Sequence, residues 1–291
     1  AEESDDYDKI EKELSKNEID IVEKNGIKFA MFNYTYGLNG FTVPSSKHYM
    51  VNLLDDEEKF ISDVKEIEDD VDMTICFLHI GTEYVYNPTT YQKEYVENLI
   101  DAGADIIVCA HPHVLEPYKE VTTDKGNKAL VYYSLGNFCS SQNVVPRLLG
   151  GMAKFTVVKE TTIDRKQNVL DEKVYIESFD LIPTVTHITS DKHTVYKLSD
   201  YTEDLAKENK VGNYDPKFSK AHLEELFKQI MDGNVTYRYV DPTPPESENE
   251  EETESEETSE EQVEDTPEVL ETGEMPDWLN NETSENENVI Y

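Results

Sequence analysis

Basic residues are scarce in this chain. Lysine and arginine together number 26 against 63 aspartates and glutamates, which gives a formal net charge of −37 over 291 residues. Binding to nucleic acid needs clustered cationic side chains that displace counterions from phosphates, so the composition excludes nucleic acid as a partner. The same charge disfavours an anionic membrane surface.

Long apolar runs are also missing. No stretch approaches the roughly 18 apolar residues that a membrane span needs, and residues 1–10 hold neither a basic region nor an apolar one. We therefore expect no membrane span and no signal peptide in this chain. The three cysteines, Cys76, Cys109 and Cys139, cannot all pair, and we expect small buried hydrophobes rather than a disulfide framework.

The acidic charge is concentrated at the C-terminus. Residues 241–291 hold 20 of the 63 acidic residues and no lysine or arginine. Such a segment cannot bury enough apolar surface to offset the entropy of the chain. The sequence therefore predicts a folded domain over residues 1–240 and a disordered acidic tail over residues 241–291.

Hydrophobic patterning in the first part of the chain predicts a hairpin and a helix. Residues 19–36 form two β-rich runs around Asn25-Gly26, which is a strong signal for a tight hairpin turn. Residues 37–54 are rich in turn formers and indicate a loop. Apolar residues at helical spacing then predict a helix that begins after a cap at Asp55 and ends near Asp69.

A strand, a helix and a second strand follow. The apolar runs 73–78 and 104–110 are typical of strands covered on both faces, and the helix between them is opened by Pro88 and closed by Gly103. Its inner face is expected to comprise Tyr91, Tyr95, Leu99 and Ile100. A crossover of this length makes the two strands parallel, so their carboxyl ends lie on the same edge of a sheet.

Later segments complete an α/β pattern. Strands are expected at residues 129–133, 153–158 and 174–181, and an amphipathic helix at residues 217–232. The apolar face of that helix is expected to comprise Leu223, Leu226, Phe227 and Ile230.

Three of the seven histidines follow the two predicted parallel strands. His79 ends the first strand, and His111 and His113 follow the second, at the edge where α/β sheets bind ligands. Neutral imidazole is a preferred ligand of several divalent metals, although single histidines at these places are more often ordinary loop residues. Spacing alone supports metal or phosphate binding and defines no reaction. The other four histidines, His48, His187, His193 and His222, have no such neighbours and are expected on the surface or in packing.

Four motifs in this region carry a family resemblance. The box H-x-G-x-E-Y begins at His79, A-G-A-D at Ala102, H-P-H at His111 and S-L-G-N-F at Ser134. In this order and spacing, the segment from about residue 19 to residue 181 closely resembles the bacterial capsule synthesis CapA family. Members of that family act in poly-γ-glutamate synthesis and fall within the calcineurin-like metallophosphoesterase superfamily.

The resemblance implies a four-layer α/β/β/α sandwich with metal ligands on loops at strand ends. It implies that His79, His111 and His113 are metal ligands, that Glu83 orients a ligand or substrate, and that Asn137 binds a phosphate or a similar oxyanion. The cofactors would be divalent metal ions (manganese, zinc or iron), two of them in a complete domain, with a metal-activated hydroxide that attacks a phosphate ester.

The resemblance also has a gap. The family normally begins with a strand ending in Gly-Asp and continues with an Asn-Asn-His box, which supply the remaining metal ligands, and neither occurs in this sequence. We therefore expect either a sandwich that is incomplete at its N-terminus, in a chain that lacks the first half of the family domain, or a degenerate relative of the family.

Two functions remain open on the sequence. The first is a phosphoesterase-type protein of capsule or poly-γ-glutamate biosynthesis that works with the polymer synthesis machinery on a phosphate ester or an anionic polymer. The second is a non-catalytic surface protein that binds an anionic polymer or a membrane synthase subunit. Both place the protein outside the cytoplasm at the bacterial cell surface, by resemblance alone.

Overall fold

The fold is given by a computed structural model that describes residues 19–44, 47 and 50–235. The chain divides into two units, Ala1–Tyr239 and Val240–Tyr291, and all described residues lie in the first. The acidic tail expected at residues 241–291 lies outside the described residues, as does His48. Among the helices described, none is both long and apolar enough to cross a membrane.

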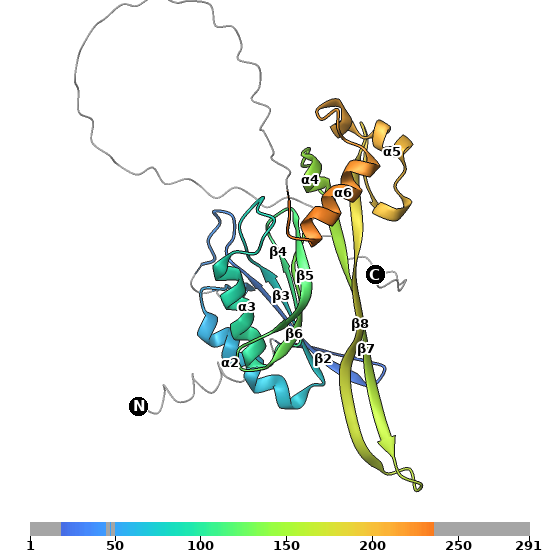
Figure 1. Ribbon diagram of the computed structural model, residues 1–291. Coiled ribbons are helices and arrows are strands. Elements are labelled where there is room, and N and C mark those ends of the chain that lie inside the picture. The colour runs from blue at the N-terminus through green and yellow to red at the C-terminus, as the bar shows by residue number, and fades with distance from the viewer. Residues whose placement is uncertain (1–18, 45–46, 48–49, 236–291) are drawn as a thin grey trace, which may run out of the picture. The chain divides into compact units, whose positions relative to one another are not determined.

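A six-stranded sheet forms the centre of the first unit (Figure 1). Its order is β1-β2-β3-β4-β6-β5, in which β2, β3, β4 and β6 run parallel and the edge strands β1 and β5 run antiparallel to their neighbours. The strands are β1 Asp20–Lys24, β2 Ile27–Thr35, β3 Met73–His79, β4 Ile106–Ala110, β5 Leu115–Thr122 and β6 Lys128–Leu135. The predicted parallel pair is thus confirmed as β3 and β4.

The first hairpin has the expected turn. Strands β1 and β2 pair in a register that sets Lys24 opposite Ile27, with only Asn25 and Gly26 between them. Both turn residues have positive φ angles, 56° and 76°. Asparagine and glycine tolerate this conformation better than other residues, so the turn chemistry fixes the register.

Two helices cover one face of the sheet. Helix α2, Glu57–Ile67, continues into the short 3₁₀ helix η2, Glu68–Asp70. Its cap is Asp56, whose side chain accepts from the backbone N–H of Lys59, so the cap expected at Asp55 is wrong by one residue. A capping side chain accepts from the backbone N–H three residues further along the chain. For the first turn of α2 that donor is Lys59, which makes Asp56 the cap.

Helix α3, Thr90–Ala102, begins after Thr89 and ends at Gly103, which has a φ of 114°. Its buried face includes Tyr95, Leu99 and Ile100 as expected, but Tyr91 is exposed. Gln92 and Val96 are buried on the face of the helix that packs on the sheet. A buried glutamine therefore occupies the position expected for Tyr91.

A second, three-stranded sheet packs on the other face. It consists of β7 Leu149–Ile163, β8 Val169–Ile188 and β9 His193–Lys197, in the order β7-β8-β9. Strands β7 and β8 are much longer than predicted and form a hairpin that extends beyond the larger sheet (Figure 1). The hairpin turn is held by Asp164, whose carboxylate accepts from the backbone N–H groups of Lys166 and Asn168.

Short helices lie at one end of the second sheet (Figure 1). They are α4 Val145–Leu148, η3 Leu198–Asp200, α5 Glu203–Glu208, η4 Lys210–Asn213 and α6 Lys220–Met231. The helix expected at residues 217–232 is confirmed as α6. Its buried residues are Leu223, Leu226 and Ile230, and Phe227 is partly buried against the same core.

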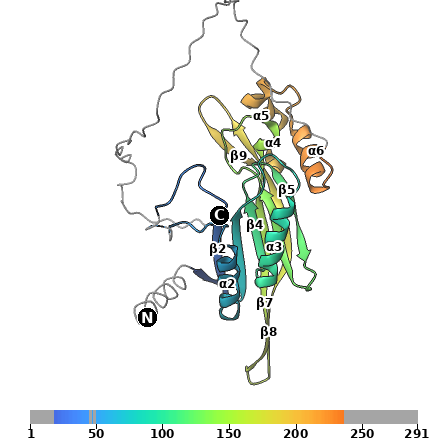
Figure 2. The ribbon, with the colours of Figure 1, turned by 90° about the vertical axis from the view of Figure 1, so that its left-hand side faces the viewer.

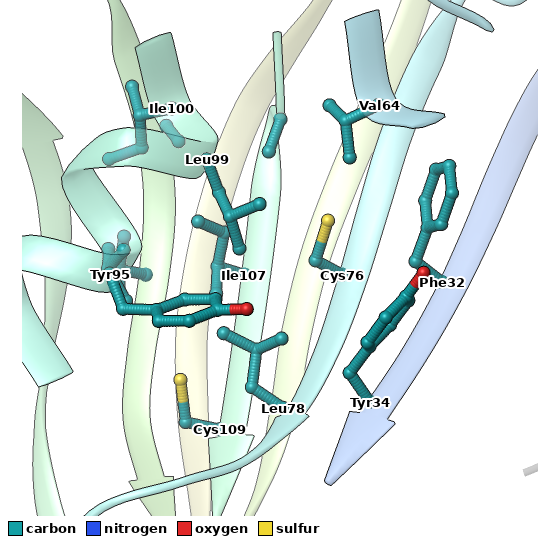
Figure 3. Close-up of a cluster of buried hydrophobic side chains, with 14 of the residues drawn as sticks. Phe32, Tyr34, Val64, Cys76, Leu78, Tyr95, Leu99, Ile100, Ile107 and Cys109 are labelled. Atoms are coloured by element: carbon teal, nitrogen blue, oxygen red, sulfur yellow. The ribbon is translucent and has the colours of Figure 1, made fainter. Parts of the chain in front are cut away.

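The larger sheet separates two hydrophobic cores. The first, between the sheet and helices α2 and α3, contains Val64, Tyr95 and Leu99 (Figure 3). The second, between the two sheets, contains Ile106, Tyr132 and Val185. Cys76 and Cys109 are buried in the first core as predicted, whereas Cys139 is exposed, because it follows the end of β6 in a loop.

These layers confirm an α/β fold in which two sheets pack face to face. A helical layer covers the outer face of the six-stranded sheet (Figure 2). The two cores bury the central strands on both sides, as the continuous apolar runs of β3 and β4 require.

The packing of α3 on the sheet can be tested by substitution in the first core. Leu99 is fully buried, so Leu99→Ala should lower the free energy of unfolding by about 2–5 kcal/mol through lost burial and a residual cavity. Leu170, which is 65% exposed on the β7–β8 hairpin, is the matched control, and Leu170→Ala should change stability by less than about 0.5 kcal/mol. Chemical denaturation measures both, and equal effects would contradict the placement of α3 on the sheet.

Candidate functional site

Four parallel strands end at one edge of the larger sheet, and the motif residues follow them. His79 is the last residue of β3, His111 follows β4, and Asn137 follows β6 by two residues. Because β3, β4 and β6 are neighbours in the sheet, their carboxyl ends lie side by side. The prediction that the histidine-bearing strand ends share one edge is therefore confirmed.

His79 and His111 are in direct contact. Nε2 of His79 lies 3.2 Å from Nδ1 of His111, and the ring centroids are 4.8 Å apart. Nδ1 of His79 lies 3.3 Å from the hydroxyl of Thr35 at the end of β2. Burial lowers the pKa of both imidazoles, and nearby histidines add to this. The charge of Glu83 raises the pKa of His111, but the net shift is downward for both rings. Both rings are therefore held in the neutral form, which has a lone pair available.

His113 is held by Asn137. The amide nitrogen of Asn137 donates to the backbone carbonyls of His113 at 3.3 Å and Arg147 at 3.0 Å, so its oxygen must face the other way. That oxygen lies 2.8 Å from Nδ1 of His113, which must then carry the proton and donate it. Nε2 of His113 lies 3.9 Å from the carboxylate of Glu83, and it carries the lone pair in the neutral tautomer that has its proton on Nδ1.

Tyr84 and Arg147 form a stack beside His113. The ring of Tyr84 stacks on His113 with a centroid separation of 6.0 Å, and the guanidinium carbon of Arg147 lies 3.5 Å from the centre of the Tyr84 ring. Glu83 is partly exposed at the rim. The edge thus combines three imidazoles with one carboxylate and one guanidinium.

The sequence did not indicate three of these neighbours. Thr35 contacts His79, Tyr36 packs on His111 at a centroid separation of 4.3 Å, and Arg147 stacks on Tyr84. Thr35 and Tyr36 could have been found, because they end a β-rich run that pairs in parallel with β3. Arg147 could not, since nothing in its local sequence connects it to the earlier motifs.

The backbone at the site is unusual. His111 and His113 have φ angles of 119° and 58°, and Tyr84 has 64°. Residues other than glycine rarely adopt positive φ, and such strain costs about 1–3 kcal/mol and persists only where the surroundings enforce it. Here Ile80 N–H donates to Ala110 C=O at 2.8 Å, and Tyr84 N–H donates to Pro112 C=O at 2.7 Å, which ties the two histidine segments together.

A metal ion fits this donor set in part. The 3.2 Å between the His79 and His111 nitrogens is close to the separation of about 3.3 Å expected for two imidazoles on one tetrahedral zinc ion. The ring of His113 lies 6.3 Å from that of His111, between centroids. Over the part of the chain that the structure describes, no group of three or more His, Cys, Asp or Glu side chains is placed to hold a metal.

The weaker histidine candidates lie elsewhere. His187 is buried and its Nδ1 lies 3.0 Å from the hydroxyl of Tyr201, which is a packing role. His193 is exposed on β9, and Nδ1 of His222 lies 3.0 Å from the backbone carbonyl of Lys217.

An α/β sandwich with clustered imidazoles at the carboxyl edge of parallel strands is a ligand-binding architecture. The chain matches the family model described as bacterial capsule synthesis protein PGA_cap over residues 10–142. That range contains His79, Glu83, His111, His113 and Asn137. The match confirms the resemblance of this chain to the bacterial capsule synthesis CapA family.

Two curated relatives agree with this. The chain is 34% identical over 128 residues to the PGA biosynthesis protein CapA of Bacillus subtilis strain 168, which covers 44% of this chain and 32% of the relative. It is 29% identical over 122 residues to the capsule biosynthesis protein CapA of Bacillus anthracis, over 40% of this chain and 28% of the relative. The alignments thus span about a third of the relatives' length or less.

Solved structures resemble the chain only distantly. A putative 5′-nucleotidase from Staphylococcus aureus has a TM-score of 0.32 at 14% identity and covers 72% of this chain and 33% of its own. The NAD nucleotidase of Haemophilus influenzae has a TM-score of 0.29 at 10% identity and covers 74% of this chain and 37% of its own. Likenesses of this extent do not bear on the chemistry of the site.

The contact between His113 and Asn137 predicts a single tautomer. We expect His113 to carry its proton on Nδ1, because the Asn137 oxygen accepts there. Long-range ¹H–¹⁵N correlation of the imidazole nitrogens reads this directly. Asn137→Ala should allow the proton of His113 to occupy either ring nitrogen. Asn98→Ala, on the exposed side of α3, should leave the proton on Nδ1. A wild-type His113 protonated on Nε2 would contradict the arrangement.

Proposed function

We propose that this sheet edge is a divalent-metal site of the phosphoesterase type, in a protein of capsule or poly-γ-glutamate biosynthesis. The observation that carries the proposal is the pair of neutral imidazoles, His79 and His111, with facing nitrogens 3.2 Å apart inside the segment that matches the capsule synthesis family. In the metal-free chain this spacing is that of an N–H···N hydrogen bond, and a divalent cation bound between the two nitrogens would displace its proton.

The side chains would divide the work as follows. His79 and His111 would bind the ion, with Thr35 fixing the orientation of His79 through its Nδ1 contact. His113 would present Nε2, the nitrogen that its contact with Asn137 leaves unprotonated. Glu83, beside that nitrogen, would orient a ligand or substrate.

Asn137 has a more specific task than the oxyanion binding expected from the resemblance. Its carboxamide makes three contacts within the protein, to His113 Nδ1 and to two backbone carbonyls. We therefore assign it to positioning His113, and any contact with an oxyanion would compete with those bonds.

A bound divalent cation would polarise a phosphoryl oxygen and lower the pKa of water enough to supply hydroxide near neutral pH. Manganese, zinc and iron all accept imidazole ligands, and the donor set does not select among them. A two-metal site needs more donors than the described residues bring together. The partners we propose are the capsule polymer synthesis machinery and a phosphate ester or anionic polymer, at the bacterial cell surface.

Metal titration tests the donor set. We expect the chain to bind a single zinc or manganese ion weakly, because two imidazoles converge and the third stands apart. Isothermal titration calorimetry gives the stoichiometry and affinity. Two tight sites per chain would show that donors outside the described residues complete the site.

Substitution of the histidines tests their roles. His111→Ala should lower zinc affinity by more than about tenfold, since even supporting residues of metal sites contribute that much. Any phosphodiesterase activity should fall with it. His193→Ala, an exposed histidine on β9, is the matched control and should change neither quantity. Equal effects of the two substitutions would show that His111 is an ordinary loop residue with no role in metal binding. Metal binding that depends on His111 without any hydrolysis would favour a non-catalytic, polymer-binding protein.

A further inference from the structure

Two buried polar side chains lie behind the histidine segments without a full set of partners. Gln92 and Glu116 are both completely buried. The amide nitrogen of Gln92 donates to the carbonyl of Tyr133 at 2.7 Å and to Oε2 of Glu116 at 3.0 Å. Within the described residues, Oε1 of Gln92 and Oε1 of Glu116 have no hydrogen-bond partner. Each unmet buried group costs about 1–3 kcal/mol, so the pair calls for an explanation.

Helix stability does not explain the position of Gln92. Thr89 caps α3 and accepts from the backbone N–H of Gln92 at 3.2 Å. With a Thr-x-x-Gln spacing, the glutamine side chain ordinarily turns back to the N–H of the capping residue. Here it points into the protein and bonds to β6 and β5 instead. Only one of the two hydrogen bonds of a capping box is therefore present. The glutamine carboxamide lies instead against the ends of β5 and β6 nearest the histidines.

That carboxamide lies beside Gly81, which in turn lies beside the ring of Pro112. A Cβ atom on Gly81 would lie 3.2 Å from Oε1 of Gln92 and 2.9 Å from Cγ of Pro112. Gly81 is two residues beyond His79, and Pro112 lies between His111 and His113. A side chain at position 81 would therefore meet both the glutamine carboxamide of α3 and the proline ring after β4, so only glycine fits between them.

Glu116 extends the same support to β5. It stands three residues after His113 and pairs with Ser134 across β5 and β6. Through its bond to Gln92 it joins the start of β5 to helix α3. The strained φ angles of His111 and His113 need such enforcement, because an unsupported chain would relax them.

We propose that Gln92 and Glu116 form a positioning pair that fixes the His79–Gly81 and His111–His113 segments against each other, and so sets the spacing of the imidazoles. The pair touches no metal or substrate itself. Its effect on metal affinity rests on the proposed function, but its effect on the imidazoles in the metal-free protein does not.

The protonation of Glu116 suits this role. Burial raises its pKa to about 8, although the Gln92 hydrogen bond and the charge of Lys93 lower it. At pH 7 the side chain is therefore mostly the neutral acid, and Glu116→Gln preserves both its shape and its charge. Glu116→Leu removes the acceptor and leaves a hydrogen of the Gln92 amide unpaired.

The test compares the unaltered 291-residue chain with its variants Gln92→Leu, Glu116→Leu and Glu116→Gln. The control is Thr123→Val, which removes a partly buried hydrogen bond to Asp101 just past the opposite end of β5. The first readout is the ¹H–¹³C resonances of the His79, His111 and His113 rings without metal. The second is zinc affinity by calorimetry, with thermal unfolding to confirm that each variant is folded.

We expect both leucine variants to shift the ring resonances and to weaken zinc binding by about 10–100-fold, as loss of supporting residues does in metal sites. Glu116→Gln should restore both readouts and Thr123→Val should leave them unchanged. Should the leucine variants fail to fold, Gln92→Asn keeps the amide but withdraws it by one methylene and should give the same shifts.

A folded Gln92→Leu with wild-type ring resonances would overturn the positioning pair. So would a failure of Glu116→Gln to rescue. If wild-type protein binds no zinc while the ring resonances still respond to the leucine variants, the proposed metal function fails and the positioning pair stands.

Discussion

The parallel pairing of β2, β3, β4 and β6 is the constraint on which the rest of the structure depends. Parallel strands are stable when both faces are covered, and the two cores on either side of the sheet provide that cover. The helices must then lie on one face and the second sheet on the other. The same pairing collects the carboxyl ends of four strands at one edge, so a cluster of imidazoles there follows from the topology.

The site itself departs from regular structure in a consistent way. Tyr84, His111 and His113 all have positive φ, and all lie in the short segments that follow β3 and β4. Backbone hydrogen bonds from Ile80 and Tyr84 across to the neighbouring segment hold them. The positions of the imidazoles therefore depend on backbone segments whose positive φ angles need support from their neighbours. The side chains that pack against these segments are for that reason part of the site.

Much of the fold could be predicted because the signals are local. The Asn25-Gly26 turn, the apolar run of β3 and the Gly103 end of α3 depend on residues within a few positions of one another. The position of the metal candidates followed from one topological rule, since a crossover between buried strands makes them parallel.

The errors and omissions arose where tertiary contacts decide. Tyr91 fits the helical spacing of an inner face, yet the bonds that Gln92 makes to β5 and β6 turn the helix away from it. Strands β5 and β9 were not predicted, because each is defined by its partner strand and not by its own pattern. Arg147 was missed because it belongs to the site through its stacking on Tyr84, and its own segment carries no motif.

The long β7–β8 hairpin bears on the order in which this chain assembles. Its pairs grow outward from the Asp164 turn, so every step closes only a short additional length of chain. Hairpins of this kind form in about 1–10 μs. Pairing β2 with β3 instead joins residues 44 positions apart, such as Thr35 and His79, and must first meet the entropic cost of closing that loop. The hairpin can thus be complete early and present an apolar template on which the slower parallel sheet condenses.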